Sequence, residues 1–373
     1  MIIEDGVLCA DERAALALRR LYSSYGYTQY KMNKFEEYDL YVRNKDFLIS
    51  DHVITFTDTN GKLMALKPDV TLSIVKNSEE SAQKKVYYQE NVYRVSGRTK
   101  AFREIMQVGL ECIGEVDSYC LLEVLTLAAR SLQQISRDYV LDISHLGIVS
   151  AVLDGVGATG EGRAALLRCI GEKNRHELAR RCAEAGIDGE GAAALEQLIS
   201  VYGEPTKTLA ALRPMLSRYA PAEMLEAFSA LLTALAHTAN APAIRLDFSV
   251  VGDMRYYSGI VFKGFVDGAS TGVLSGGEYN GLMQKMGKRE GAIGFAVYLD
   301  ALERLANDGA AYDVDTVVLY DGTADLAALQ AAIDGLTRDG ATVLAARSKP
   351  NKLSYRRLLR FDEKEGGLYE VDA

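Results

Sequence analysis

The stretch 106–112 places an amide and a carboxylate at alternate positions. If it forms a β-strand, Gln107 and Glu111 share one face with Gly109 between them, and the opposite face is apolar. A glycine between two polar residues weakens a strand unless something approaches the backbone closely. A strand face that presents an amide, a carboxylate and the exposed backbone of a glycine would suit the binding of a small polar ligand. An outer strand with a solvated polar face gives the same alternation, so the pattern alone leaves both interpretations open.

Neighbouring segments predict the strands that would surround this face. Residues 53–58 are β-branched and aromatic, and the dipeptide Asn60-Gly61 that follows predicts a hairpin with residues 62–66. Residues 86–95 and 105–113 predict two further strands, joined by a polar, basic loop. The polar face is therefore expected inside an antiparallel sheet.

Helical patterns flank these strands. Asp11 is expected to cap a first helix that ends near Gly26, and a leucine-rich helix is expected at 119–136. Residues 151–241 are rich in alanine, leucine, arginine and glutamate, which predicts a helical insertion. Residues 313–373 predict a small β-α-β piece, in which a long crossover permits a parallel strand pair.

Composition excludes several classes of function. The chain has 373 residues and a formal net charge of −9, which argues against a broad nucleic-acid or anionic-membrane footprint. Its five cysteines form no CxxC pair and its four histidines are isolated from one another, so no metal or other cofactor is expected. The N-terminal residues lack the apolar core of a signal peptide, and no apolar run is long enough to cross a bilayer. We therefore expect a cytoplasmic protein without a membrane partner.

Five blocks occur in an order that resembles the class II aminoacyl-tRNA synthetase core of histidyl-tRNA synthetase. The resemblance spans residues 1–150 and 242–308, with the helical insertion 151–241 between them and a truncated C-terminal α/β domain at 313–373. It implies an α/β (α+β) fold with a mixed, mainly antiparallel sheet flanked by helices. The blocks are ITFTDTNGKLMALKPDVT, YYQENVYRVSGRTKAFREIMQVGLECIG, VVGDMRYYSGIVF, GGEYNGLMQKMG and GAIGFAVYLDALERL.

The same resemblance implies a histidine pocket. An acid and a threonine that hold the ligand amino group fall at Asp69 and Thr71, and the arginine that contacts carboxylate and α-phosphate falls at Arg94. A carboxylate pair suits an ammonium group, and tyrosine hydroxyls suit an imidazole. Alternatively, Tyr256 and Tyr257 could simply be core and strand residues. The full set implied is Asp69, Thr71, Arg94, Gln107, Glu111, Tyr256, Tyr257 and Tyr279.

Departures from the family bear on catalysis. Where the family has an arginine that assists attack on ATP, the sequence has Gly252, and Asp300-Ala301 stands where the family has Glu-Arg. Arginine suits bidentate phosphate recognition, and alanine cannot replace it. This combination resembles a second group, the regulatory subunit of ATP phosphoribosyltransferase. That resemblance implies a non-catalytic chain that forms a homodimer within a hetero-oligomer, pairs with the short-form catalytic subunit and takes histidine as effector. On this resemblance, we do not expect the chain to bind tRNA.

Two other hypotheses remain. Arg255 could replace the missing arginine, which would make the chain a divergent histidyl-tRNA synthetase or an adenylating paralogue. Alternatively, the pocket could be vestigial and the chain a scaffold. The basic loop with Arg98, Lys100 and Arg103 could meet an anion or the partner, and the segment Lys31–Lys34 lacks the proline that the family carries near its dimer interface.

Overall fold

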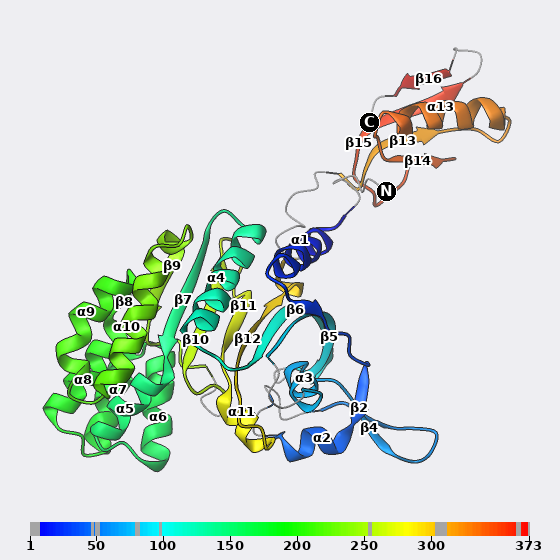
Figure 1. Ribbon diagram of the computed structural model, residues 1–373. Helices are drawn as coiled ribbons and strands as arrows, with labels where there is room; N and C mark the ends of the chain where they lie inside the picture. The colour runs from blue at the N-terminus through cyan, green and yellow to red at the C-terminus, as the bar shows by residue number, and fades with distance from the viewer. Residues whose placement is uncertain are drawn as a thin grey trace. The chain divides into compact units, whose positions relative to one another are not determined.

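The computed structural model describes residues 8–45, 48, 53–78, 83–96, 99–252, 256–302, 312–362 and 367–371. The chain divides into two compact units, residues 1–303 and 304–373, which are described separately (Figure 1). The segment 151–241 lies within the first unit.

A nine-stranded sheet forms the centre of the first unit. Only two neighbouring pairs, β1 with β5 and β7 with β9, run parallel, and the other pairs are antiparallel. The predicted mixed, mainly antiparallel sheet is therefore confirmed. In spatial order its strands are β1 (Thr28–Gln29), β5 (Lys84–Val95), β6 (Phe102–Gly114), β12 (Gly291–Tyr298), β11 (Leu274–Glu278), β10 (Ile260–Val266), β7 (Tyr139–His145), β9 (Ile244–Asp247) and β8 (Tyr202–Gly203).

The register aligns residues in rows across one face of this sheet, because directly paired residues point to the same side. The centre of each row is made of small residues, which leaves room above the strands for larger side chains. One row is Tyr88, Gly109, Ala296, Ser275, Lys263 and Asp142, and the next is Glu111, Gly294, Gly277, Val261 and Ser144.

The glycine pair Gly276-Gly277 lies inside β11. A Cβ on Gly276 would lie 2.4 Å from the Phe295 Cβ, and one on Gly277 would lie 2.7 Å from a ring carbon of Tyr257. These glycines allow close packing on the strand instead of ending it.

Two helices cover the other face, α1 (Ala10–Ser24) and α4 (Ser118–Ile135). Asp117 caps α4 by accepting a 2.8 Å hydrogen bond from the Cys120 amide. The expectation for α1 is wrong: its N-cap is Cys9, whose amide is satisfied by Glu12, and Asp11 lies in the first turn. Leu18 and Tyr22 of α1 are fully buried, and each such side chain contributes about 1.5–3 kcal/mol through burial.

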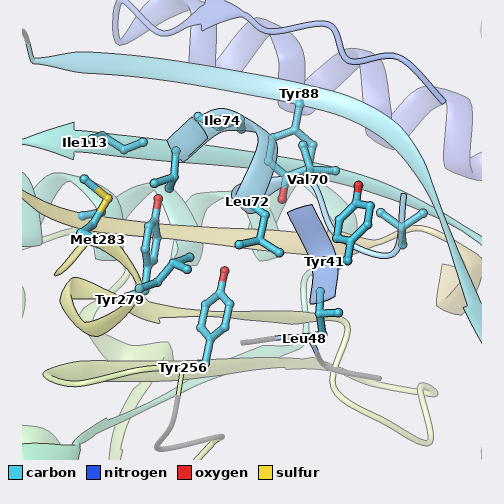
Figure 2. Packing of buried hydrophobic residues seen from close by; sticks show 14 of the residues in the cluster. Tyr41, Leu48, Val70, Leu72, Ile74, Tyr88, Ile113, Tyr256, Tyr279 and Met283 are labelled. Carbon is cyan, nitrogen blue, oxygen red and sulfur yellow. The ribbon is translucent and has the colours of Figure 1, made fainter. Parts of the chain in front are cut away.

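Smaller elements cover the face that carries the rows. They are a three-stranded sheet of β2 (Phe35–Glu37), β4 (Leu63–Leu66) and β3 (Thr55–Thr57), with helices α2 (Tyr38–Arg43), α3 (Thr71–Lys76) and α11 (Asn280–Lys285). The predicted hairpin around Asn60-Gly61 is confirmed by the antiparallel pairing of β3 and β4. Figure 2 shows the buried cluster under these elements, in which Tyr88, Tyr256 and Tyr279 come from three different segments.

A group of helices follows β7 and gathers at the β7, β9 and β8 end of the sheet, drawn in green in Figure 1. Pro205 occupies the first turn of its helix, where a missing N–H costs nothing, while Pro214 lies inside the same helix. The helices are α5 (Leu146–Gly155), α6 (Gly160–Gly171), α7 (Arg175–Glu184), α8 (Gly189–Ser200), α9 (Pro205–Leu216), α10 (Ala222–Ala236) and the 3-10 turn η2 (Ala241–Ala243).

The second unit contains a four-stranded sheet and helix α13 (Leu326–Arg338). Strand β13 (Val314–Leu319) pairs in parallel with β14 (Val343–Ala346), as the β-α-β pattern predicts. Strands β15 (Tyr355–Asp362) and β16 (Gly367–Glu370) complete the sheet. Among the described helices of both units, none is long and apolar enough to cross a membrane.

Candidate functional site

A single small cavity on the row-bearing face of the sheet brings together all eight residues assigned to the pocket from sequence. They come from the start of α3, from β5 and β6, from the segment before β10 and from the end of β11. The cavity is lined by Asp69, Thr71, Arg94, Gln107, Glu111, Tyr256, Tyr257 and Tyr279, together with Tyr88, Ser275, Gly294, Phe295, Ala296 and Tyr298.

Glu111 lies at the centre of this cavity and is 2% exposed. Its two carboxylate oxygens each accept a 2.7 Å hydrogen bond, one from the Thr71 hydroxyl and one from the Tyr279 hydroxyl. Burial raises the pKa of Glu111 to about 8, an effect that these two hydrogen bonds oppose. The carboxyl is thus held in place by neutral donors and has no basic partner in this network.

Glycines in the adjacent strands make room for the polar side chains. A Cβ on Gly294 would lie 1.7 Å from the Glu111 Oε2, and a Cβ on Gly109 would lie 2.5 Å from the Tyr88 hydroxyl oxygen. Gln107 and Glu111 are 3% and 2% exposed, so the alternative of a solvated outer strand is wrong. The bare backbone at Gly109 is used by the Tyr88 side chain.

Three polar side chains near Glu111 differ in the hydrogen bonds that they form within the protein. One oxygen of buried Asp69 accepts a 2.9 Å hydrogen bond from the Leu72 amide in the first turn of α3. Arg94 Nε donates to the Pro68 carbonyl at 3.1 Å, but its buried Nη2 has no hydrogen-bond partner in the described structure. Among the same described residues, no hydrogen bond is found for the side-chain amide of Gln107. A buried donor without an acceptor is costly, which makes the Arg94 guanidinium ready to bind a ligand, with Gln107 in the same cavity lining.

Tyr256, Tyr257 and Tyr279 form an aromatic wall. The Tyr256 ring lies 4.7 Å from the Tyr257 ring and 5.9 Å from the Tyr279 ring, measured between centroids. Burial raises the pKa of all three hydroxyls well above the usual value, so they act as neutral hydrogen-bonding groups. In Figure 2 the hydroxyls of Tyr256 and Tyr279 point the same way. The tyrosines are therefore both core residues and pocket lining.

The cavity is nearly filled by its own side chains. Its volume is about 30 Å³, enough for one or two water molecules. A second cavity of about 830 Å³ lies beside it, and Tyr256, Tyr257, Ser275 and Tyr298 line both. A ligand as large as an amino acid requires the small cavity to widen. The side chains that line both cavities separate the small cavity from the larger one, so a movement of these side chains would supply the space.

Sequence reasoning missed Tyr88, Ser275, Gly294 and Tyr298. The alternation 294, 296, 298 in β12 carried a signal, since these residues pair with Glu111, Gly109 and Gln107 in β6. That signal depends on knowing that β12 is the neighbour of β6, which the sequence does not state.

The positions that depart from the family are only partly described. Gly252 has a left-handed backbone with φ of +53°, and a Cβ there would lie 3.3 Å from the Tyr257 ring, so a larger side chain would be strained. Arg103 forms a 3.0 Å ion pair with Asp300. Arg98 and Arg255 lie outside the described residues, and no role is assigned to them. Among the described histidine, cysteine and acidic residues, none form a group of three that could hold a metal ion.

Comparisons with known proteins identify relatives that match most of this chain. A chain named ATP phosphoribosyltransferase regulatory subunit from Moorella thermoacetica is 28% identical over 88% of this chain and 88% of its own length. The protein of the same name from Oceanobacillus iheyensis is 25% identical over 78% of this chain and 73% of its own length.

Two solved structures share the fold. An ATP phosphoribosyltransferase regulatory subunit/histidyl-tRNA synthetase from Bacillus halodurans has a TM-score of 0.70 at 23% identity, covering 90% of this chain and 88% of that one. A chain of the ATP phosphoribosyl transferase (HisG:HisZ) complex from Thermotoga maritima has a TM-score of 0.61 at 21% identity, covering 78% and 97%. A sequence model described as histidyl-tRNA synthetase matches residues 9–302. The chain therefore belongs to the histidyl-tRNA synthetase family.

Proposed function

We propose that this chain is a regulatory subunit of ATP phosphoribosyltransferase in histidine biosynthesis. The relatives from Moorella thermoacetica and Oceanobacillus iheyensis have that name, and this chain aligns with most of their length. The fold is also that of a chain in a solved ATP phosphoribosyl transferase complex. The partner is then the short-form catalytic subunit, and the chain forms a homodimer within the assembly in the cytoplasm.

The pocket around Glu111 is, in this proposal, the histidine sensor. The observation that carries it is the buried Arg94 Nη2, which has no hydrogen-bond partner among the described residues and lies with Gln107 in the lining of the same cavity. A ligand carboxylate would satisfy the guanidinium, and a ligand nitrogen that bears a proton would bind the Glu111 carboxylate. Histidine carries both kinds of group. Its binding would ionise Glu111 and displace the hydroxyl donors that occupy it in the free chain.

The chain is further proposed to be non-catalytic. Charge develops on phosphate when an amino acid is activated by ATP, and positive groups must stand where it develops. At the two positions where the family resemblance places arginines, this chain has Gly252 and Ala301. The left-handed backbone at Gly252, in which a side chain would be strained, supports the view that no long side chain is accommodated there.

Reconstitution tests this function. Phosphoribosyltransferase activity of the short-form catalytic subunit is measured with and without this chain, and we expect the chain to raise it. Histidine-dependent pyrophosphate exchange is measured on the chain alone, and none is expected. Exchange activity, or a catalytic subunit indifferent to the chain, would contradict the proposal and favour the adenylating alternative.

A further inference from the structure

The larger cavity has charged walls that the proposed histidine site does not use. Strands β7, β9, β10, β11 and β12 all contribute to its lining, and its charged lining residues are Asp142, Asp247, Lys173 and Lys263. Asp247 and Lys173 satisfy each other through a 2.6 Å ion pair. Asp142 and Lys263 form no ion pair among the described residues, although Lys173 lies close enough to Asp142 to oppose the rise in its pKa.

Asp142 is 7% exposed, and its Oδ1 has no hydrogen-bond partner in the described structure. Its carboxylate also forms a hydrogen bond with the Tyr202 hydroxyl. Burial, with nearby Asp247, raises the pKa of Asp142 to about 6, so the group is ionised at neutral pH. A buried carboxylate oxygen that lacks a donor is a group that a ligand ammonium would satisfy.

Lys263 is the direct cross-strand neighbour of Asp142, which places their Cβ atoms about 4.5–5.5 Å apart on one face. Even so, no ion pair joins Lys263 to an acid in the described part of the chain. Its ammonium instead lies over the Phe265 ring, 5.4 Å from the centroid. Gly272 allows this position, since a Cβ there would lie 2.4 Å from the Lys263 Cε.

The two charges therefore face one cavity side by side without neutralising each other. Apolar side chains, Phe265, Val250 and Val261 among them, line the same space. From this arrangement we infer that the larger cavity is a second binding site, for an α-amino acid with an apolar side chain, whose ammonium meets Asp142 and whose carboxylate meets Lys263. This site goes beyond the proposed histidine sensor and does not depend on it.

Calorimetric titration of the full chain with L-phenylalanine tests the inference, with 2-phenylethylamine and 3-phenylpropionate as probes that each lack one charge. We expect one equivalent of phenylalanine to bind, and each analogue to bind at least about tenfold more weakly. Lys263→Met and Asp142→Asn should weaken phenylalanine to a similar extent, while Lys207→Met, at an exposed lysine outside both cavities, should not.

Two further variants keep the test independent of folding defects and of the histidine site. Gly272→Ala keeps every charge but displaces Lys263, and it should also weaken phenylalanine. Gln107→Ala alters only the smaller cavity and should leave phenylalanine binding unchanged. No binding at about 10 mM, equal binding of the analogues, or loss in Gln107→Ala but not in Lys263→Met would each overturn the inference.

Discussion

Replacing Glu111 by glutamine should make the free protein more resistant to alkaline pH. In the folded chain burial raises the pKa of this carboxyl from 4.5 to about 8. A carboxyl that holds its proton more tightly when folded favours the folded state at low pH. That contribution is lost as the pH rises from the unfolded to the folded pKa. Glutamine carries no such charge, and its amide can still bond both the Thr71 and Tyr279 hydroxyls.

The size of the effect follows from the two pKa values. Between pH 5 and pH 9 the wild-type free energy of unfolding should fall by up to about 4 kcal/mol relative to the variant. Chemical denaturation of both proteins at several pH values measures this difference. Glu115→Gln, at an exposed glutamate just beyond β6, is the matched control and should follow the wild type. Parallel pH profiles for wild type and Glu111→Gln would refute the account of Glu111.

The same substitution should weaken histidine binding, because an amide cannot pair with a ligand cation as a carboxylate does. Stability and affinity would then change in opposite directions, as is common for groups held in a functional site. If Glu111→Gln bound histidine as tightly as the wild type, Glu111 would not be part of the histidine-binding site.

Three further results are expected. Gly294→Ala should lower the free energy of unfolding by about 1–3 kcal/mol and abolish histidine binding, because the new Cβ would overlap the Glu111 carboxylate. Gly162→Ala is the control, since its Cβ would make only a 3.8 Å contact, and it should be neutral or stabilising in thermal denaturation. Glu90→Ala should destabilise by about 3–5 kcal/mol in chemical denaturation, since it leaves the 1% exposed Lys67 ammonium unpaired, and adding Lys67→Met should restore much of the loss. By calorimetry, Arg94→Met should weaken histidine but not histamine, which lacks the carboxylate. An equal loss for both would contradict the assignment.

The sequence was most informative where local chemistry decides structure. Asn60-Gly61 identified its hairpin because the connecting turn needs a residue that tolerates a left-handed backbone, and Gly61 has φ of +82°; the turn itself is longer than two residues, since Thr57 pairs with Leu63. The eight pocket residues were assigned through the family resemblance, and the fold brings all of them to one cavity. Only Gln107 and Glu111 were indicated by alternation alone.

Other features depend on contacts between distant segments. Tyr88 belongs to the site because it packs on Gly109 across a strand pair, and strand order is not written in a local pattern. Gly276-Gly277 lies inside β11 because Phe295 and Tyr257, which come from other segments, pack closely against these two glycines. The larger cavity, which contains Asp142, had no local signal because its lining comes from five strands and several loops.

The central claim, that histidine acts through the Glu111 pocket, is tested most directly by feedback inhibition in the reconstituted complex. Phosphoribosyltransferase activity is measured across a histidine titration with wild-type chain and with Gln107→Ala, using Glu115→Gln as control. The account predicts full activation by the Gln107→Ala chain but at least about tenfold more histidine for half-inhibition. Identical inhibition curves for all three chains would contradict it and place the effector elsewhere.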